Sequence, residues 1–181
     1  MQALGIVELN SIASGIETAD AMLKTAEVKL VGAHAICAGK YLILVQGDVA
    51  AVKSAMESAS TTAKENLVND KMIANLHPQV FHALLGAGEI NEAQAVGIIE
   101  TFSVATCVTA ADVAVKTSDV SLIEIRLARG LGGKAFAIIN GDVAAVRASV
   151  ENAVNQHKEE GMIAKHVVIP SLHKDLLNAI M

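Results

Sequence analysis

Aromatic residues are scarce in this sequence, and tryptophan is absent: phenylalanine and tyrosine make up 2% of the 181 residues, whereas apolar residues make up 52%. The core therefore has to be built from alanine, valine, isoleucine and leucine, which lets helices and strands approach closely. Basic runs are also absent, and the formal net charge is −5. Without basic patches or aromatic side chains on which bases stack, we expect no nucleic-acid partner.

Long apolar runs are missing as well. No stretch approaches the roughly 20 residues that a membrane-spanning helix needs, so we expect no membrane association. The first residues lack a basic segment followed by an apolar one, so we expect no secretory signal. The only two cysteines, Cys37 and Cys107, lie at non-equivalent positions of the repeat described next, which does not indicate a disulfide framework. These absences predict a cytosolic protein.

The sequence repeats itself internally. The hexapeptide Gly-Asp-Val-Ala-Ala-Val occurs at 47–52 and again at 141–146, and the match extends along most of the chain. The matching pairs include Ala3–Glu8 with Ala95–Glu100, Ala19-Asp20 with Ala111-Asp112, Lys24 with Lys116, Gly39-Lys40 with Gly133-Lys134, and His77 with His173. The second copy is longer only in the loop Arg129–Gly133. We therefore predict a first domain at 1–84, a short linker at 85–94 and a second domain at 95–181.

Each copy predicts the element order β-α-β-β-α-β-α. Apolar, β-branched runs indicate four strands per copy, at Leu4–Leu9, Val28–Ile36, Lys40–Gln46 and Leu67–Ile73, and at Val96–Glu100, Val120–Ala128, Lys134–Asn140 and Met162–Val168. Ser11 or Ser14 caps the first helix, while Asp48 and Asp142 occupy the N-cap positions of Ala-rich helices that end near Glu65 and Glu160. Brief helices follow from His77 and His173. The predicted class is α+β, two ferredoxin-like domains with helices on one face of an antiparallel sheet.

The repeated motifs resemble those of the bacterial microcompartment shell-protein domain. They are Ala-Leu-Gly-Ile-Val-Glu, Ala-Asp-Ala-Met-Leu-Lys, Gly-Lys and Gly-Asp-Val, in the order Ala3–Glu8, Ala19–Lys24, Gly39-Lys40 and Gly47–Val49, with counterparts in the second copy. Each copy opens on its Gly-Ile-Xaa-Glu strand, which is typical of the unpermuted domain. The resemblance covers nearly the whole chain and is closest to tandem-domain shell proteins of propanediol-utilisation microcompartments.

The resemblance implies a structural role without enzyme activity. Such proteins form homotrimers that mimic a hexamer, tile with other shell proteins in a microcompartment shell within the cytoplasm, and leave a pore on the threefold axis. Small metabolites crossing the pore and encapsulated enzymes are the further partners implied. Two fused copies of a sixfold module do close a ring as three chains, and small aromatic-poor modules gain stability by burying their flanks. The alternative is a tandem ferredoxin-like protein that acts alone as a ligand sensor.

Cys37 lies between the second and third strands, where the family places its pore loop. The resemblance implies that Cys37 of three chains binds one 4Fe-4S cluster, since clusters need several thiolates and a threefold axis supplies three. The fourth iron would have no cysteine from this loop. Electron or cluster transfer across the shell is then expected. The alternatives are an unligated pore thiol in a cluster-free tile that passes small metabolites, and a small buried hydrophobe.

The residues expected to line the pore flank that thiol in the first copy and occupy the equivalent loop of the second. They are Ala38, Gly39, Arg129, Gly130, Leu131 and Gly132. A cation at Arg129 either favours the Cys37 thiolate or only sets the sign of the pore.

Lys24 and Lys116 end the first helix of each copy. The resemblance implies that they lie at the tile edge and meet their counterparts across the contact between tiles; the alternative is a solvated helix-end lysine favoured by the helix dipole. The family often carries an arginine just before the last helix, but here the sequences are Ala-Asn-Leu-His at 74–77 and Pro-Ser-Leu-His at 170–173. We expect Cys107 to be a packed core thiol, and His77 and His173 to cap the last helices.

Overall fold

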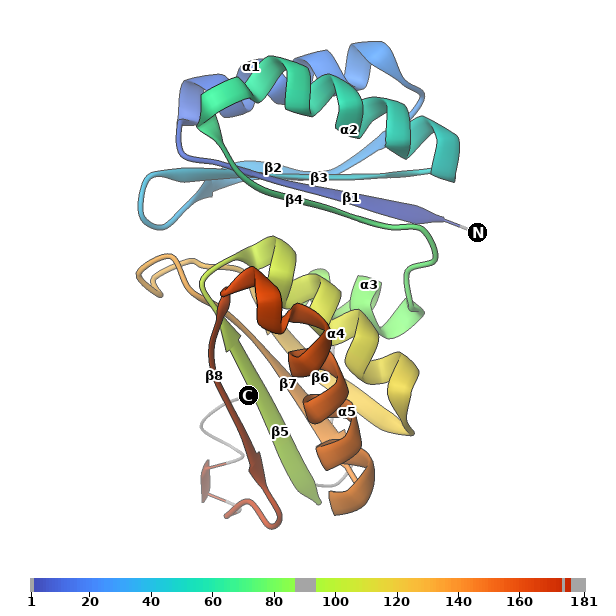
Figure 1. The fold of residues 1–181 in the computed structure, drawn as a ribbon, viewed down its shortest axis with the longest axis vertical. Coiled ribbons are helices and arrows are strands. Elements are labelled where there is room, and N and C mark those ends of the chain that lie inside the picture. Colours follow the sequence, from blue (N-terminus) through green and yellow to red (C-terminus); the bar gives the residue numbers. More distant parts are fainter. Residues whose placement is uncertain (1, 87–93, 174, 177–181) are drawn as a thin grey trace. The chain divides into compact units, whose positions relative to one another are not determined.

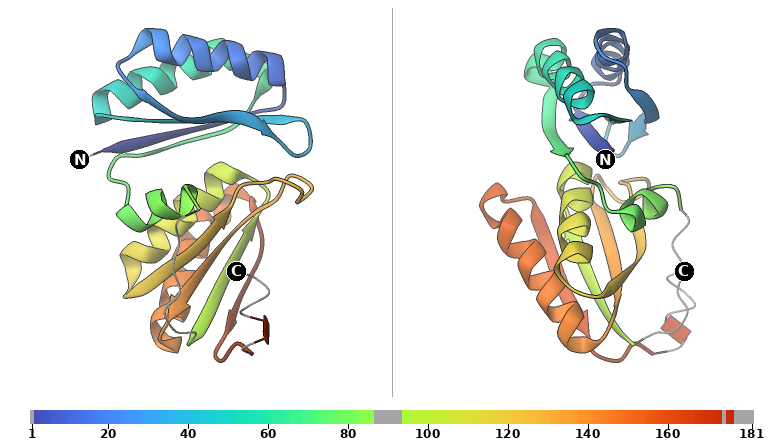
Figure 2. Two further views of the ribbon diagram at one scale, coloured as in Figure 1. Left: turned by 180° about the vertical axis from the view of Figure 1, so that it is seen from behind. Right: turned by 90° about the vertical axis from the view of Figure 1, so that its right-hand side faces the viewer.

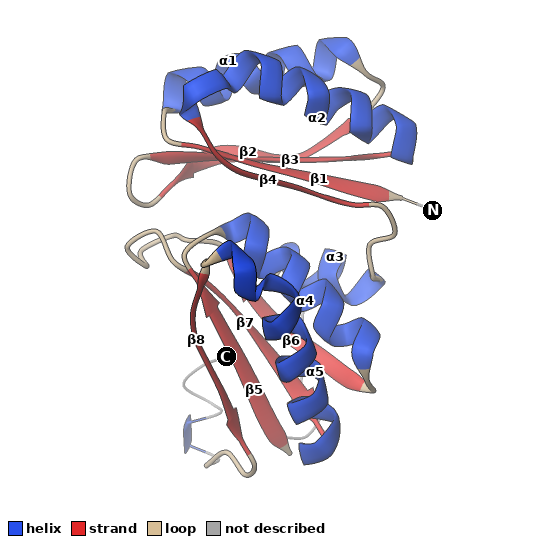
Figure 3. Cartoon of the chain, viewed as in Figure 1, coloured by secondary structure: helices blue, strands red, loops and turns tan. Residues whose placement is uncertain are grey.

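The structure is a computed structural model that describes residues 2–86, 94–173 and 175–176 (Figure 1). The chain divides into two compact units. One comprises Met1–Leu76 together with Ala128–Gly133, and the other comprises His77–Leu127 together with Lys134–Met181. Each unit contains a four-stranded sheet covered by helices (Figure 3), which confirms the α+β class predicted from the repeat.

The first unit has the strand order β2-β3-β1-β4, in which all neighbouring strands are antiparallel. Helices α1 and α2 cover one face of this sheet, as the two views of Figure 2 show. Every residue of the central strand β1 is buried, including Glu8, and its otherwise apolar sequence predicts burial on both faces. The elements are β1 Ala3–Leu9, α1 Ile12–Thr25, β2 Lys29–Ile36, β3 Lys40–Gly47, α2 Val49–Ala63 and β4 Leu67–Ile73.

The second unit repeats this arrangement with the strand order β6-β7-β5-β8. Helices α4 and α5 pack on its sheet as α1 and α2 do on the first. Its elements are α3 Pro78–Leu84, β5 Ala95–Thr101, α4 Val104–Thr117, β6 Val120–Arg126, β7 Ala135–Gly141, α5 Val143–His157 and β8 Ile163–Ile169. Single turns of 3-10 helix, at Lys64–Asn66 and Lys158–Glu160, close α2 and α5.

Most predicted element ends lie within a few residues of the observed ones, and one of the small differences has a clear backbone cause. Strand β6 stops at Arg126 and not at Ala128, because Ala128 has a φ of 42° and leaves the extended region. Ser11, and not Ser14, caps α1, since its hydroxyl accepts the Ser14 N–H. The Asp142 carboxylate caps α5 through the Ala144 N–H, whereas the Asp48 side chain makes no such bond.

Glycine in the first strand of each copy lets a helix lie directly on the sheet. A Cβ at Gly5 would stand 2.8 Å from Met56 Sδ of α2, and one at Gly97 would stand 2.7 Å from a methyl group of Val150 on α5. Both distances are shorter than real Cβ contacts. The glycine of the Gly-Ile-Xaa-Glu motif is therefore a packing requirement.

The two cores differ at a pair of contacting positions: where the first copy has a small residue on the helix and a large one on the strand, the second copy has the reverse. In the first unit, Gly15 leaves room for the Tyr41 ring, and a Cβ at Gly15 would stand 2.4 Å from that ring. In the second copy the corresponding residues are Cys107 and Ala135, both fully buried. Cys107 is therefore a packed core thiol, as its apolar surroundings predicted.

The compact units do not follow the predicted domain limits throughout. Helix α3 lies within the predicted first domain, 1–84, yet it belongs to the second unit, where it packs against β6. The Gln79 side chain accepts the Leu122 N–H and donates to the Val120 carbonyl, which satisfies backbone groups at the sheet edge. The loop Ala128–Gly133 belongs to the first unit. Most of the predicted linker, residues 87–93, lies outside the described residues.

Because Gly15 and Tyr41 contact each other, the effects of replacing them on the free energy of unfolding should be coupled. Tyr41→Ala should lower the free energy of unfolding by about 3–5 kcal/mol, and Gly15→Cys should lower it by about 1–3 kcal/mol through overpacking. The double variant, which copies the second unit, should lose less than the sum of the two. Urea unfolding of all four proteins measures the coupling.

Gly32→Ala is the control for glycine replacement itself, because its added Cβ meets no atom closer than 3.5 Å. Strict additivity of the two substitutions would contradict the proposed exchange.

Candidate functional site

Cys37 lies directly after β2, in contact with the loop that follows β6. Its backbone N–H donates to the Ala128 carbonyl at 2.9 Å, and its Sγ accepts the Gly130 N–H at 3.1 Å. Both partners belong to the first unit. The thiol is partly exposed, and the neighbouring Ala38 and Gly39 are exposed. The loops that the repeat makes equivalent therefore meet at this sulfur.

The loop reaches Cys37 through an unusual backbone. Ala128, Gly130, Gly132 and Gly133 all have positive φ values, between 42° and 88°. Such a conformation turns successive N–H groups toward one side, an arrangement that binds anions. A Cβ at Gly133 would stand at an ordinary contact distance of 3.4 Å from the Cys37 carbonyl oxygen, so its φ of 88°, and not lack of space, favours glycine there.

Backbone amides, rather than a basic side chain, stabilise the anionic form of Cys37. The Gly130 N–H lowers the pKa of the thiol most, followed by the Leu131 N–H, and the slight burial of the sulfur opposes them. The charge of Arg129 acts on His34 instead. Burial of the imidazole lowers the pKa of His34 most, and the nearby positive charge of Arg129 lowers it further. The His34 imidazole therefore stays neutral at neutral pH, and its buried Nε2 has no hydrogen-bond partner among the described residues.

The predicted pore-lining residues gather around Cys37 within the first unit. Ala38, Gly39, Arg129, Gly130 and Gly132 are exposed, and Leu131 is partly exposed. Their convergence follows from the contact between the two loops. Whether they surround a pore depends on further chains, so that role stays a prediction.

An ion pair anchors each loop, and the sequence analysis did not identify it. Lys40 Nζ lies 2.9 Å from Glu8 Oε2, and Lys134 Nζ lies 3.0 Å from Glu100 Oε1. Glu8 is fully buried, whereas the second pair is partly exposed. The glutamate ends the Gly-Ile-Xaa-Glu motif and the lysine ends the Gly-Lys motif. Because both motifs occur in each copy, the sequence contained a signal from which this ion pair could have been predicted.

The predicted edge lysines differ in their surroundings. Lys24 pairs with Asp20 on an exposed stretch of α1, with 2.6 Å between Nζ and Oδ2. Lys116 pairs with Asp112 on α4 in the same i,i+4 relation, but Asp112 is buried and its Oδ1 also accepts the His77 N–H. Only Lys24 thus lies on a fully open surface of its unit.

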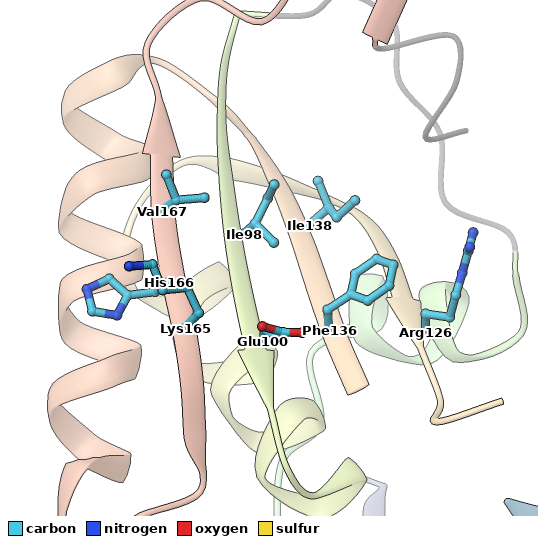
Figure 4. Close-up of a pocket in the computed structure, with 8 residues that line it drawn as sticks. All are labelled: Ile98, Glu100, Arg126, Phe136, Ile138, Lys165, His166 and Val167. Atoms are coloured by element: carbon cyan, nitrogen blue, oxygen red, sulfur yellow. The ribbon is translucent and has the colours of Figure 1, made fainter. Parts of the chain in front are cut away.

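A second feature, which no motif predicted, is an apolar groove on the sheet of the second unit (Figure 4). Its floor includes Ile98 and Ile138, and the Arg126 guanidinium lies 5.4 Å from the centre of the Phe136 ring. The residues that line it are Ile98, Glu100, Arg126, Phe136, Ile138, Lys165, His166 and Val167. Its lining includes no cysteine, serine or threonine, and no group of three metal-ligating side chains occurs there among the described residues.

The described part of a single chain brings no set of metal ligands together. Across the described residues, three or more His, Cys, Asp or Glu side chains are nowhere grouped for a metal ion. Cys37 offers a single sulfur, and a cluster would need more thiolates than one chain supplies. None of the described helices is long and apolar enough to cross a membrane.

Comparison with known proteins gives one family model, the BMC domain, which matches residues 3–76 and 95–172. The bacterial microcompartment shell protein PduT of Citrobacter freundii is 43% identical over 175 residues, covering 97% of this chain and 95% of PduT. The carboxysome assembly protein CcmO of Synechocystis sp. is 31% identical over 188 residues, covering 96% of this chain and 63% of CcmO.

A solved structure supports the same relationship. The crystal structure of a microcompartment protein from Desulfitobacterium hafniense DCB superposes with a TM-score of 0.89 at 48% sequence identity. The alignment covers 98% of this chain and 99% of that one. Both copies of the repeat thus have counterparts in one solved chain.

The two ion pairs predict unequal losses of stability. Lys40→Met removes the ammonium group that pairs with the buried Glu8 carboxylate and should lower the free energy of unfolding by about 3–5 kcal/mol. Lys134→Met breaks the partly exposed pair and should cost about 0–1 kcal/mol. Chemical denaturation of the two variants tests the difference, and equal losses would contradict it.

The amide environment predicts a reactive thiol at Cys37. In metal-free protein, the pH midpoint of its alkylation by iodoacetamide should lie below that of a free cysteine, about 8.5, because a lowered pKa leaves more thiolate at any given pH. Mass spectrometry should find the buried Cys107 unmodified in the folded chain. Arg129→Gln should leave the midpoint unchanged. A return to the ordinary midpoint in that variant would show that the side chain, not the backbone, is responsible.

Proposed function

The chain belongs to the BMC-domain family of bacterial microcompartment shell proteins, with two domains in tandem, and from this premise we propose that three chains form a tile whose pore binds an iron–sulfur cluster. Family membership makes it a structural protein of the microcompartment shell and not an enzyme. It also implies assembly with other shell proteins. The trimer, the pore and the cluster are the parts that we propose.

The trimer follows from the doubled module. Each unit has the same strand order, so one chain supplies two similar wedges of a ring. Three chains related by cyclic symmetry then supply six. Equivalent loops of adjacent wedges have to approach one another near the axis of such a ring. The Gly130 N–H bonded to Cys37 Sγ is a contact of this kind between equivalent loops, and it is the observation that carries the proposal.

The residues around Cys37 fit an iron–sulfur cluster. Thiolates are the preferred ligands, and the amides of the Gly130 loop favour the thiolate form. N–H groups that donate to sulfur also tune reduction potential. Three chains contribute three Cys37 thiolates, and the loop has no second cysteine for a fourth iron. When bound, a 4Fe-4S cluster supplies one-electron transfer.

The chain's own residues would hold and shape that site. Gly130 and its neighbours orient the sulfur and stabilise its charge, while the Glu8–Lys40 pair fixes the base of the Cys37 loop on β1. Arg129 places a cation on the exposed side of the loop, which offsets negative charge there. These contacts support transfer of electrons or of the cluster across the shell.

A tile edge at Lys24 and Lys116 completes the proposal. Lys24 is exposed at the end of α1, where a contact between tiles can reach it, whereas Lys116 is held by the buried Asp112. We expect the two edges of one chain to contribute unequally. The missing family arginine before the last helix points to a different edge contact.

A cluster-free tile is the second candidate function. The exposed residues beside Cys37 are mostly small, notably Ala38, Gly39, Gly130 and Gly132. Small, flexible loops of this composition suit a pore that passes small metabolites. In that case the thiol only lines the channel.

Metal analysis distinguishes the two functions. Anaerobically purified protein should form trimers that hold about four iron and four sulfide ions each. Cys37→Ser should remove the iron and leave the trimer intact, because the thiol is not part of a core. Cys107→Ser, at the buried thiol, is the matched control and should retain the iron. Iron-free trimers after anaerobic reconstitution would contradict the cluster and favour the metabolite pore.

A further inference from the structure

The second repeat has two residues before β8, Gly161 and Met162, that have no counterpart in the first repeat. The 3-10 turn that closes α5 ends at Glu160 and β8 begins at Ile163, whereas β4 follows the equivalent turn without a gap. The sequence alignment had placed all extra residues of the second repeat in the loop Arg129–Gly133. The insertion is therefore a second place at which the two units differ.

A pocket opens beside this insertion, between the end of α5 and β8. Its volume is about 410 Å³, and Val154, Gly161 and Ile163 contribute to its lining. Phe102 lies next to it, because its backbone N–H donates to the Met162 carbonyl at 2.9 Å. Phe102 is 51% exposed. An exposed aromatic side chain beside a pocket is the kind of residue that most often anchors a protein partner.

Every titratable side chain among the described residues that line the pocket is basic. These side chains belong to Lys158, Lys165 and His166, and all three residues are exposed. Figure 4 shows the two residues of β8, with the His166 ring on the side of the strand that faces α5. None of the three forms an ion pair with a described residue, and the exposed Glu159 does not line the pocket. The pocket therefore presents positive charge to a partner.

The first unit has a different surface at the equivalent place. At the positions of the two basic residues of β8, strand β4 has Asn69 and Asp70. At the position of the exposed aromatic residue, the first repeat has Asn10. The combination of an aromatic residue, an apolar pocket and unpaired basic side chains therefore belongs to the second unit, and a trimer presents it three times.

The pocket lies at the end of the second sheet from which the chain leaves for the Cys37 contact. Thr101 pairs with Ile163 of β8 on one side and with Ala135 of β7 on the other. Ala135 begins β7 shortly after the loop whose Gly130 N–H donates to Cys37 Sγ. Two strand spacings, roughly 10 Å, separate the first residue of β8 from the point where that loop rejoins the sheet. A protein docked at the pocket thus approaches the Cys37 end of the chain.

We propose that an acidic one-electron carrier protein docks on this β8 surface, which consists of Phe102, Val154, Lys158, Ile163, Lys165 and His166. The inference rests on the proposed cluster at Cys37 and names the partner with which that site exchanges electrons. Because the chain has a net charge of −5, most of its surface repels an acidic protein, and the unpaired cations select where the protein approaches. Burial of the aromatic side chain then holds the complex. One electron passes between the carrier and the cluster, and no atom is transferred.

Calorimetric titration with a plant-type 2Fe-2S ferredoxin, an acidic one-electron carrier, tests the docking surface. The full-length chain is used in a Cys37→Ser background, so that binding is measured without a cluster. Lys158→Glu combined with Lys165→Glu should weaken binding about tenfold at low salt. Lys53→Glu combined with Lys64→Glu, which reverses two exposed charges of the first unit, is the matched control and should retain the affinity.

A second variant tests the aromatic anchor. Phe102→Asn copies the first repeat and should weaken ferredoxin binding about tenfold or more, because it removes apolar contact area and leaves the charge unchanged. Absence of ferredoxin binding would overturn the inference. Equal weakening by the two lysine pairs would do the same, since it would show repulsion by net charge and not docking at one place. Unchanged affinity of Phe102→Asn would remove the anchor and overturn the surface as drawn.

Electron transfer separates the docking surface from the cluster itself. With the Cys37 thiol intact and iron bound, stopped-flow oxidation of reduced ferredoxin should be about tenfold slower in the Lys158→Glu, Lys165→Glu variant, at unchanged iron content. Equal rates in parent and variant would overturn the inference and leave the cluster standing. A parent without iron that still binds ferredoxin through these residues would contradict the cluster and support the docking surface. Variants that bind ferredoxin normally but no longer form sheets would assign the surface to contact between tiles, which overturns the inference.

Discussion

The buried ion pair between Glu8 and Lys40 is the constraint from which the loop geometry follows. A carboxylate with no solvent access needs a partner, and its partner is the residue that begins β3 directly after the Cys37 loop. The pair fixes where β2 ends and where the chain turns, and so where the thiol stands relative to the amides of Gly130 and Leu131. The partly exposed Glu100–Lys134 pair occupies the same position in the second unit but contributes less to stability, because water can solvate its charges.

The repeat made most of the fold predictable. Apolar periodicity located the strands and helices of both copies, and the motifs indicated which loop carries the thiol. The amide environment of Cys37 could not be predicted, because it depends on positive φ values at Gly130 and its neighbours and on a contact between residues far apart in sequence. The sequence suggested that the Arg129 side chain could stabilise the Cys37 thiolate, whereas backbone N–H groups do so.

The sequence also could not predict on which sheet α3 packs. Its apolar face indicates that it packs on a sheet, but both sheets of the chain offer an equivalent edge. The choice is made by specific polar contacts, with Gln79 on the backbone of β6 and Asp112 on the His77 N–H. The apolar groove around Phe136 could not be predicted for a similar reason, because its lining comes from all four strands of the second sheet, and β5 and β8 join that sheet from distant parts of the repeat.

Each compact unit includes a segment from the other half of the sequence, and this affects how the chain can fold during synthesis. Helix α3 leaves the ribosome before the strand that it contacts, and the Ala128–Gly133 loop leaves long after the Cys37 that it contacts. Domains commonly fold as units while the chain grows, N-terminal first. Here neither unit is complete until the second half has been translated. A nascent chain stalled between the repeats would present an uncovered Cys37 thiol and an undocked helix, both of which chaperones and proteases can recognise.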